Sequence, residues 1–464
     1  MSSKITHVTE CGRPTEFRKF LRDLNNDGGC SGTGVGVEMR NCVARSNNDT
    51  YPVSADEYEA EVIMATWNHI QAIRCPRPFQ IQLLRAGIAE VEKECRSAKE
   101  CDFTYAGNKQ LEEPVEEFHY DLVKLQKFVV NNLEKLITRL DVDAEEDNPK
   151  HYDEYNLLCN NEKCHCFTSA IIETTTMNST MTTLTNITKP LHVSAIIKNK
   201  PRKMEDRHVC LERFSEMYQL KQSYSFYGVF DGHSGTLAAS YAVNQLPYLL
   251  AKQLKVTQTN EIDIREAFES SFLQTDRMFA RKRISSGTTA VCALLTHTNP
   301  NHLYIAWVGD SKALLVGIKA SLQLVKPHKP DLMDERKRIE CNETGGAVMF
   351  VQGQWRVNGI LNVSRSIGDF SVSAVIAEPD IVDVEITAEH DFLVLATDGL
   401  WDHVAEQQVI DAIYTALAIA EQKVEDIPKI LIDLAKKGDS QDNITVVIVF
   451  LKERQKIVEC YKKN

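Results

Sequence analysis

Apolar residues recur with two different periods along the chain. Between residues 51 and 140 they return every three or four positions, which is the spacing of one face of an α-helix. The longest such series consists of Val115, Phe118, Leu122, Leu125, Val129, Leu133 and Leu136. A stripe of this kind forms either the inside of a helical domain or a surface for a partner, and we expect the inside of a domain, which is the more frequent use.

Local signals add detail to this helical region and its flanks. Ser54 to Glu57 has the pattern of a capping box, so we expect a helix from there to about Ile73, ended by the Pro-containing run Cys75 to Pro78. The acidic segment Asp141 to Tyr155 and the Ser/Thr-rich segment Thr174 to Thr188 predict a solvated linker. The predicted parts are a flexible N-terminus with loop or disorder (1–50), a helical domain (51–140), a linker (141–190) and a second domain (191–455).

From His192 onward short runs of β-branched and aromatic residues replace the helical period, with helices between them. The expected helices are Gly235 to Gln253, Ile262 to Arg281, Asp331 to Cys341 and Glu406 to Ala420. This order is typical of two packed antiparallel sheets covered by helices, rather than of a parallel βαβ sheet. The predicted fold class is therefore α+β, preceded by an α-helical region.

Composition narrows the class of protein. A length of 464 residues predicts about two to three domains, and 43% hydrophobic with 25% charged residues is ordinary for a soluble globular protein. A net charge of −12 without a basic face argues against nucleic-acid binding. The N-terminus lacks an apolar signal core, and no stretch approaches the roughly 20 apolar residues of a membrane span. We therefore expect a soluble protein of the cytoplasm, with the nucleus as a further location.

The 13 cysteines follow no extracellular spacing and predict reduced thiols. Cys159, Cys164, His165 and Cys166 place four soft ligands within eight residues. Structural zinc sites need a second, distant pair of ligands, which is missing from this sequence. Free thiols in a linker are the favoured interpretation, and zinc is the alternative.

Acidic residues stand at the ends of several strand-like runs, at Glu205-Asp206, Asp231, Asp398 and Asp442. One of them opens the triplet Asp231-Gly232-His233, which sets a carboxylate, an approachable carbonyl and an imidazole side by side. Hard divalent cations take oxygen ligands, and Mg²⁺ in particular needs only a few carboxylates to hold it. The carboxylates at these strand ends therefore suit a site for two such cations. For the triplet alone, a tight Asp-Gly turn after a strand is the alternative.

Seven sequence blocks occur in one recognisable order: Met204 to Asp206, Asp231 to Gly235, Ser286 to Ala290, Gly309 to Ser311, Val363 to Asp369, Asp398 to Asp402, and Asp442-Asn443. In these blocks, over about residues 192 to 452, the chain resembles the metal-dependent Ser/Thr protein phosphatases of type 2C. Lys203 to His208 and Trp307 to Lys312 most resemble the calcium/calmodulin-dependent-kinase phosphatases, also called partner-of-PIX phosphatases. The resemblance implies an α-β-β-α sandwich of two antiparallel sheets flanked by helices.

The resemblance also implies a metal centre. Asp231 would bridge two Mn²⁺ or Mg²⁺ ions. The carbonyl of Gly232 and the carboxylate of Glu205 would hold one ion. Asp398 and Asp442 would hold the other. Together the ions would activate a bridging hydroxide for in-line attack on phosphoserine or phosphothreonine.

Further residues complete the implied site. His233 would protonate the leaving oxygen, because an imidazole is an effective acid near neutral pH. Asp206 would act through metal-bound water, and Thr289 would orient the ligands from behind the ions. Asp310 and Asp402 would hold a weaker third ion, with a turn-capping Asp as the alternative for both.

The chain departs from the family at the phosphate-binding Arg. The family carries it three residues before the Met of Met-Glu-Asp, where this chain has Pro201, with Arg202 one place later. On a regular strand Arg202 and Glu205 point to opposite faces, so Arg202 reaches the site only if Pro201 or a bulge resets the register. On that condition we expect Arg202 to bind the substrate phosphate. Arg365 and Asp369 are expected to support the fold or the adjacent flap rather than to touch phosphate.

The implied function is that of a protein serine/threonine phosphatase acting on phosphorylated proteins. The subgroup resemblance points to protein kinases as substrates and to a PIX-type adaptor bound by the N-terminal helical region. Calcium dependence is not implied, because the sequence has no EF-hand loop. The alternatives are a catalytically inactive scaffold of the same fold and a hydrolase of small phosphate esters. Retention of the carboxylates and His233 favours catalysis, because scaffolds of this kind typically lose metal ligands.

Overall fold

The computed structural model describes most of the chain, namely residues 20, 21, 24, 50–97, 120–145, 191–256, 263–341, 343 and 345–462. The chain divides into two compact units, residues 1–185 and 186–464. None of the described helices combines the length and the apolar composition that a membrane span requires.

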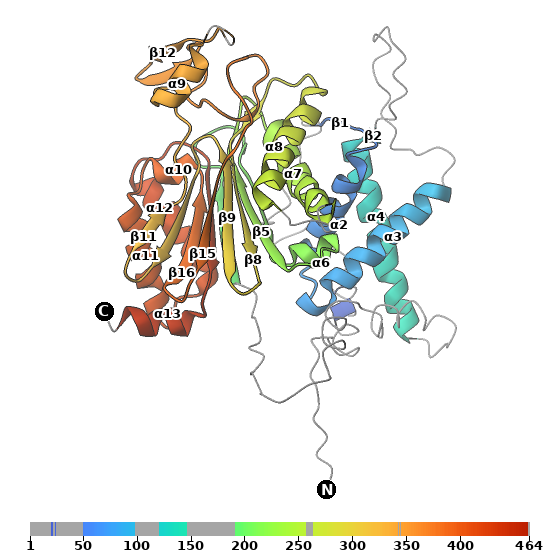
Figure 1. Cartoon of the computed structure of the whole chain (residues 1–464). Helices are drawn as coiled ribbons and strands as arrows, with labels where there is room; N and C mark the ends of the chain where they lie inside the picture. Colours follow the sequence, from blue (N-terminus) through green and yellow to red (C-terminus); the bar gives the residue numbers. More distant parts are fainter. Residues whose placement is uncertain are drawn as a thin grey trace, which may run out of the picture. The chain divides into compact units, whose positions relative to one another are not determined.

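The described part of the first unit contains three long α-helices (Figure 1). They are α2 (Tyr58–Ala72), α3 (Gln80–Ser97, after a 3-10 turn at Arg77–Phe79) and α4 (Leu122–Glu145). Short strands β1 (Pro52–Val53) and β2 (Tyr120–Asp121) pair with each other. The predicted first helix is confirmed, and half of its capping box is present: the Glu57 carboxylate accepts a hydrogen bond from the Ser54 N–H, at 2.8 Å.

The apolar stripe of α4 lies inside the helical unit, as predicted. Its described members are all buried, namely Leu122, Leu125, Val129, Leu133 and Leu136. At Gly87 of α3, an added Cβ would lie 3.0 Å from both Leu133 of α4 and Thr66 of α2. The three helices therefore meet at this glycine. Val115 and Phe118 of the predicted stripe lie outside the described residues.

Two expectations for the N-terminal half need correction. Helix α4 continues to Glu145, so the first residues of the predicted linker are helical. The reason is that Ala144 and Glu145 are good helix formers and follow the α4 stripe without a breaker. Residues 20, 21 and 24 are also helical, where loop or disorder was expected. Phe20, Leu21 and Leu24 have helical spacing, a signal that was overlooked. The cysteine-rich cluster at 159–166 and the segment 174–188 lie outside the described residues.

The second unit is a sandwich of two antiparallel five-stranded sheets in its described part. The first sheet has the order β11-β10-β16-β17-β3, and the second has the order β15-β9-β8-β5-β4. Strands of the first sheet are β3 (Leu191–Ile197), β10 (Lys312–Gly317), β11 (Ser321–Gln323), β16 (His390–Ala396) and β17 (Ile444–Phe450). Strands of the second are β4 (Arg207–Leu211), β5 (Tyr224–Phe230), β8 (Ala290–Thr296), β9 (Asn301–Val308) and β15 (Asp380–Ile386).

The inner faces of the two sheets share one buried core, to which Val229 and Trp307 of the second sheet and Leu395 and Val447 of the first contribute. Helices cover both outer faces (Figure 1). Those on the second sheet are α6 (Phe214–Tyr218), α7 (Leu237–Val256) and α8 (Ile264–Ala280). Those on the side of the first sheet are α10 (Asp398–Trp401), α11 (Glu406–Ala418), α12 (Ile427–Lys437, after a 3-10 turn at Val424–Asp426) and α13 (Arg454–Tyr461). The predicted α-β-β-α sandwich is confirmed.

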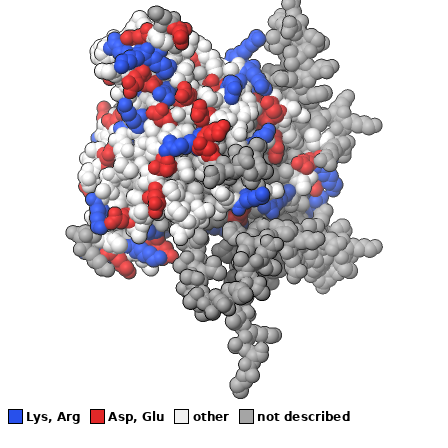
Figure 2. Space-filling model, in the orientation of Figure 1, with Lys and Arg blue, Asp and Glu red and all other residues white. Residues whose placement is uncertain are grey.

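Two small elements stand at the edge of this sandwich. The flap consists of α9 (Met333–Ile339) and the hairpin β12 (Val348–Val351) and β13 (Gln354–Val357), with its own small core. On the face drawn in Figure 2, Lys and Arg side chains gather over the flap at the upper left. A three-stranded sheet of order β14-β7-β6 joins β6 (Gly232–His233), β7 (Gly287–Thr288) and β14 (Ile367–Gly368).

Candidate active site

The predicted carboxylates stand where strands of the two sheets begin or end. Asp231 directly follows β5, all of whose residues are buried. Asp398 opens α10 after β16, and Asp442 precedes β17. A Cβ at Gly399 would come within 2.0 Å of the Asn443 carbonyl oxygen. The turns that carry Asp398 and Asp442 are therefore packed directly against each other.

Asp231 and Asp398 form the electrostatic centre of the site. Burial raises the pKa of Asp231 well above its usual range, and the negative charge of Asp398 raises it further. Burial likewise raises the pKa of Asp398, while a hydrogen bond from Asp231 opposes the rise. Other carboxylates act on one or both of these groups, namely Asp206, Asp310, Asp402 and Asp442. We refer to these six side chains as the carboxylate cluster.

Asp206 is the most enclosed member of the cluster, with 1% of its surface exposed. Its Oδ2 accepts hydrogen bonds from the hydroxyl groups of Thr397, at 3.0 Å, and Thr445, at 2.7 Å. Burial raises the pKa of Asp206 to about 7, and the two hydroxyl groups offset this only in part. Thr397 follows β16 and Thr445 lies in β17, so Asp206 is fixed by the strands next to Asp398 and Asp442.

Asn443 positions the backbone of Glu205. Its side-chain oxygen accepts a hydrogen bond from the Glu205 N–H, and its amide donates to the Lys198 carbonyl, both at 2.7 Å. These bonds tie the loop between β3 and β4 to the start of β17. The Glu205 carbonyl in turn approaches Gly232, where a Cβ would lie only 2.5 Å from it, so glycine is required there. The role of Asn443 was missed from the sequence, although its place between Asp442 and a strand was the available signal.

Thr289 fixes the turn that presents Asp231. Its N–H donates to the Asp231 carbonyl at 2.9 Å, and the Asp231 N–H donates to the Thr289 hydroxyl at 3.3 Å. The same hydroxyl lies 2.8 Å from Oγ of Ser311. Thr289 therefore acts on the backbone of Asp231, and through it on the direction of the carboxylate.

His233 is held by a carboxylate from a distant segment. Its Nε2 lies 2.6 Å from Oδ2 of Asp369. The small sheet brings them together, because His233 pairs with Gly287 and Gly287 pairs with Gly368. A Cβ at Gly287 would come within 2.0 Å of the Asp369 carboxylate, which therefore passes directly over this glycine.

Asp369 is set for this contact by its backbone. Its φ of 55° is left-handed, which Asp tolerates better than most residues, and its Oδ2 also accepts a hydrogen bond from the Ser366 hydroxyl at 2.6 Å. Asp369 was expected to support the fold or the adjacent flap rather than to touch phosphate, and the structure adds a contact that orients the candidate acid. The available signal was the Gly368-Asp369 pair, a sequence that favours an unusual turn.

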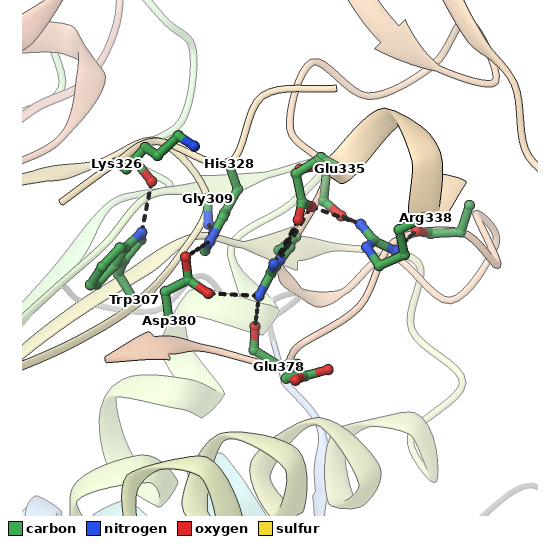
Figure 3. A network of polar contacts seen from close by, with 11 residues as sticks. Trp307, Gly309, Lys326, His328, Glu335, Arg338, Glu378 and Asp380 are labelled. Carbon is green, nitrogen blue, oxygen red and sulfur yellow. Dashed lines mark hydrogen bonds and ion pairs between the residues drawn. The ribbon is translucent and has the colours of Figure 1, made fainter. Parts of the chain in front are cut away.

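Arg365 supports the flap, as expected, through the carboxylate of Glu335. Figure 3 shows Glu335 in its network with Arg338 and Asp380. Arg365 bonds the carboxylate of Glu335 in α9, at 2.6 Å, and that of Asp380 in β15, at 3.1 Å. Arg338 reaches Glu335 from the other side, at 2.9 Å. Glu335 is thereby enclosed by two guanidinium groups, that of Arg338 in the same helix and that of Arg365, which joins the flap to Asp380 of the sandwich.

Arg202 lies in a bend between β3 and β4, with its side chain exposed. The segment from Lys198 to Asp206 is not part of a strand. The strand-register argument for Arg202 is therefore wrong, because alternation of faces applies only within a strand. In a loop, the direction of this side chain is not fixed by its spacing from Glu205.

The donor set fits hard divalent cations, because it consists of carboxylate oxygens whose mutual repulsion a cation would offset. Within the described ranges, however, no three His, Cys, Asp or Glu side chains already stand as a metal ion requires. Asp231 is hydrogen-bonded to Asp398, and Asp310 to Lys329. Binding of a cation therefore requires these side chains to exchange their present partners for the ion.

Comparison with known proteins identifies the family. The model of protein phosphatase 2C matches residues 193–444, more than half of the chain. The chain belongs to the protein phosphatase 2C family. Human protein phosphatase 1F is 39% identical over 270 residues, which cover 57% of this chain and 57% of that protein. Mouse protein phosphatase 1E is 38% identical over 275 residues, which cover 58% of this chain and 35% of that protein.

The match spans about half the length of protein phosphatase 1F and a smaller part of 1E. Among solved structures, one described as a sex determining protein of C. elegans has a TM-score of 0.67 and 20% identity. The match covers 89% of this chain and 91% of the chain in that structure. This likeness concerns the fold, and it extends beyond the residues matched by the family model.

Proposed function

We propose that this phosphatase 2C family member is a metal-dependent protein serine/threonine phosphatase that binds two Mn²⁺ or Mg²⁺ ions in the carboxylate cluster. The observation that carries the proposal is the mutual repulsion of the six carboxylates of the cluster, together with His233, which follows Asp231 by two residues and has its own carboxylate partner. Family membership and the identity to protein phosphatase 1F support it.

In this proposal Asp231 would contribute to the holding of both ions. The Gly232 carbonyl and Glu205 would hold one ion. Asp398 and Asp442 would hold the other. The chemistry that such ions supply is neutralisation of the phosphate charge and activation of water. The packing of Gly399 against Asn443 supports the pairing of Asp398 with Asp442 at one ion.

The remaining members of the site act around these ligands. Asp206, enclosed by two threonine hydroxyl groups, orients water rather than binding an ion directly. Thr289 keeps Asp231 in place through its backbone. Asp310 and Asp402 form the weaker third site, at the edge of the cluster where Asp402 is exposed.

His233 holds the proton for the leaving oxygen of the serine or threonine. Because Nε2 is engaged by Asp369, the other ring nitrogen, Nδ1, remains for donation to that oxygen. Asp369 stabilises the protonated ring and fixes its orientation. Arg202, exposed in the loop that precedes Glu205, binds the phosphate of an incoming substrate.

The identity to protein phosphatases 1F and 1E supports the partner-of-PIX subgroup as the finer assignment. The substrates would then be phosphorylated protein kinases, and the helical region at 51–140 would recruit a PIX-type adaptor. The second domain (191–455) carries the catalytic site, and the segment between 146 and 190 links the two. The free thiols of Cys75, Cys210 and Cys292 agree with a reducing location such as the cytoplasm.

The decisive experiment measures phosphate release from a phosphothreonine peptide by the full chain, with Mn²⁺ and with EDTA. Asp231→Asn should abolish release, because it removes the bridging carboxylate. Asp383→Asn, on the outer strand β15, is the matched control and should keep the activity. If folded wild-type protein releases no phosphate with Mn²⁺, the proposed phosphatase activity is refuted and an inactive scaffold is favoured. Activity on p-nitrophenyl phosphate but not on any phosphopeptide favours a hydrolase of small esters.

A further inference from the structure

An ammonium group lies at one edge of the carboxylate cluster. Nζ of Lys329 is hydrogen-bonded to Oδ2 of Asp310, and Asp310 is buried, with 4% of its surface exposed. Burial alone would lower the pKa of Lys329, but the neighbouring carboxylates raise it on balance, namely Asp310, Asp398 and Asp402. The ammonium group is therefore paired directly with Asp310, one of the two residues proposed for a weak third ion.

Contacts of the preceding residue, His328, hold the segment that carries Lys329; Figure 3 shows His328 with Gly309, Trp307 and Lys326. The His328 N–H donates to the Gly309 carbonyl at 2.8 Å, and the Gly309 N–H donates back to Nδ1 of His328 at 3.2 Å. The His328 ring stacks on Trp307, with centroids 5.9 Å apart and planes 16° apart. The Trp307 indole N–H donates to the Lys326 carbonyl at 3.0 Å. The segment that carries Lys329 is thus attached to Gly309, which directly follows β9 and directly precedes Asp310.

The same segment continues into the flap. The Leu332 N–H donates to the Lys329 carbonyl at 3.1 Å, and α9 begins at the next residue. Glu335 of α9 is in turn bonded to Arg365 and Arg338. Lys329 is therefore fixed on both sides, which distinguishes it from a surface lysine that contacts an acid by chance.

We propose that Lys329 is a tethered cation that takes the place of a third divalent ion at Asp310. The proposal rests on the proposed two-ion centre. An ammonium group and a divalent cation compete for the same carboxylate oxygens, so a third ion binds only by displacing Lys329 from Asp310. The lysine thereby keeps the affinity of the third site low, while the ligands of the two-ion centre remain available.

The test is a titration of the EDTA-treated full chain with Mn²⁺, in which the paramagnetic resonance signal reports free ion and calorimetry reports heat. Lys329→Met removes the charge and keeps most of the apolar stem. We expect its weakest Mn²⁺ to bind at least about tenfold more tightly than in the wild type. The charge-assisted bond that no longer has to be displaced is worth more than the roughly 1.4 kcal/mol of a tenfold change.

Matched variants separate the charge from other effects. Lys329→Arg keeps the positive charge and should titrate like the wild type. Lys329→Met in an Asp310→Asn background should give no gain, because the contested carboxylate is gone. If Lys329→Met does not fold, Lys329→Gln replaces it in the test. The glutamine keeps a neutral hydrogen-bond donor to Asp310, and we expect the same tighter Mn²⁺ binding.

The outcomes distinguish this inference from the proposed function. Unchanged or weaker Mn²⁺ binding in the charge-free variants overturns the role of Lys329, even if the wild type binds two ions. Wild-type protein that binds no Mn²⁺ overturns the two-ion centre itself. Tighter third-ion binding that persists in the Asp310→Asn background would place the competition at another carboxylate, and would also overturn the inference.

Discussion

Replacing Asp369 with Asn removes the charge beside His233 and keeps the surrounding loop. The 2.6 Å separation of Nε2 and Oδ2, with Asp369 buried, makes this a short charge-assisted hydrogen bond. Asn tolerates the left-handed backbone of position 369, where φ is 55°, and its side-chain oxygen still accepts the imidazole N–H. The substitution therefore tests the charge and not the shape.

The expected size of the effect follows from the contact. A hydrogen bond to a charged group contributes roughly 1.5–3 kcal/mol and a neutral one roughly 0.5–1.5 kcal/mol, so the substitution loses about 1–1.5 kcal/mol. About tenfold fewer molecules would then hold the protonated ring in place, and kcat should fall by about that factor. Complete removal of the acid, by His233→Gln, should cost about 10²- to 10⁴-fold.

The assay compares two leaving groups. A phosphothreonine peptide releases a strongly basic alkoxide that needs a proton, whereas p-nitrophenyl phosphate releases a weakly basic phenolate that does not. Asp369→Asn should lower kcat on the peptide about tenfold and on the aryl ester less than about twofold, with KM nearly unchanged. Equal losses on both substrates would refute the role in proton donation. Asp276→Asn is the control, because Asp276 binds the neighbouring Gly368 N–H at 2.8 Å rather than His233; it should leave the ratio of the two activities unchanged.

Three further substitutions test neighbouring parts of the site. Gly287→Ala places a Cβ within 2.0 Å of the Asp369 carboxylate and should reproduce the leaving-group dependence, with a loss of about 1–3 kcal/mol in urea unfolding; a uniform loss on both substrates would contradict this. Burial would raise the pKa of Glu335, but hydrogen bonds led by that from Arg365 lower it from 4.5 to about 2. The folded pKa lies below the unfolded one, so this group stabilises the fold above pH 4.5 and the contribution is lost as pH falls toward 2. Glu335→Gln should therefore lower the free energy of unfolding by about 2–3 kcal/mol at neutral pH, and by less in acid; parallel pH curves for the two proteins would refute this. Arg202→Ala should raise KM for a phosphopeptide about tenfold with little change in kcat, and an unchanged KM removes Arg202 from the site.

The acidic strand ends could be predicted because their signal is local. Strand β5 is buried at all its positions and ends in the apolar-rich run Tyr227 to Phe230, so the carboxylate of Asp231 marks where the strand ends. The same reasoning applies to Asp398 after β16 and, in reverse, to Asp442 before β17. The order of the strands and the family resemblance together then predict that the two sheets pack with the turns of Asp231, Asp398 and Asp442 close to one another.

The partners of these groups could not be predicted in the same way. His233 and Asp369 lie 136 residues apart, and their contact depends on the pairing of three short strands and on a positive φ. Periodicity carries no information about either condition. The error over Arg202 has a related cause, because a strand was assumed where β3 has already ended.

Several candidate catalytic groups are positioned by residues from other segments. Glu205 depends on Asn443, and His233 on Asp369. Asp206 is held by the hydroxyl groups of Thr445 in the first sheet and of Thr397, which directly follows a strand of that sheet. This arrangement is what a cluster of like charges requires, since buried carboxylates repel one another and stay together only if neighbouring donors and the packed sheets hold them. Substituting a residue that positions one of these groups should therefore change metal affinity or proton donation at a cost to stability too small to unfold the protein. The ratio of peptide to aryl-ester activity in Asp369→Asn tests this expectation most directly.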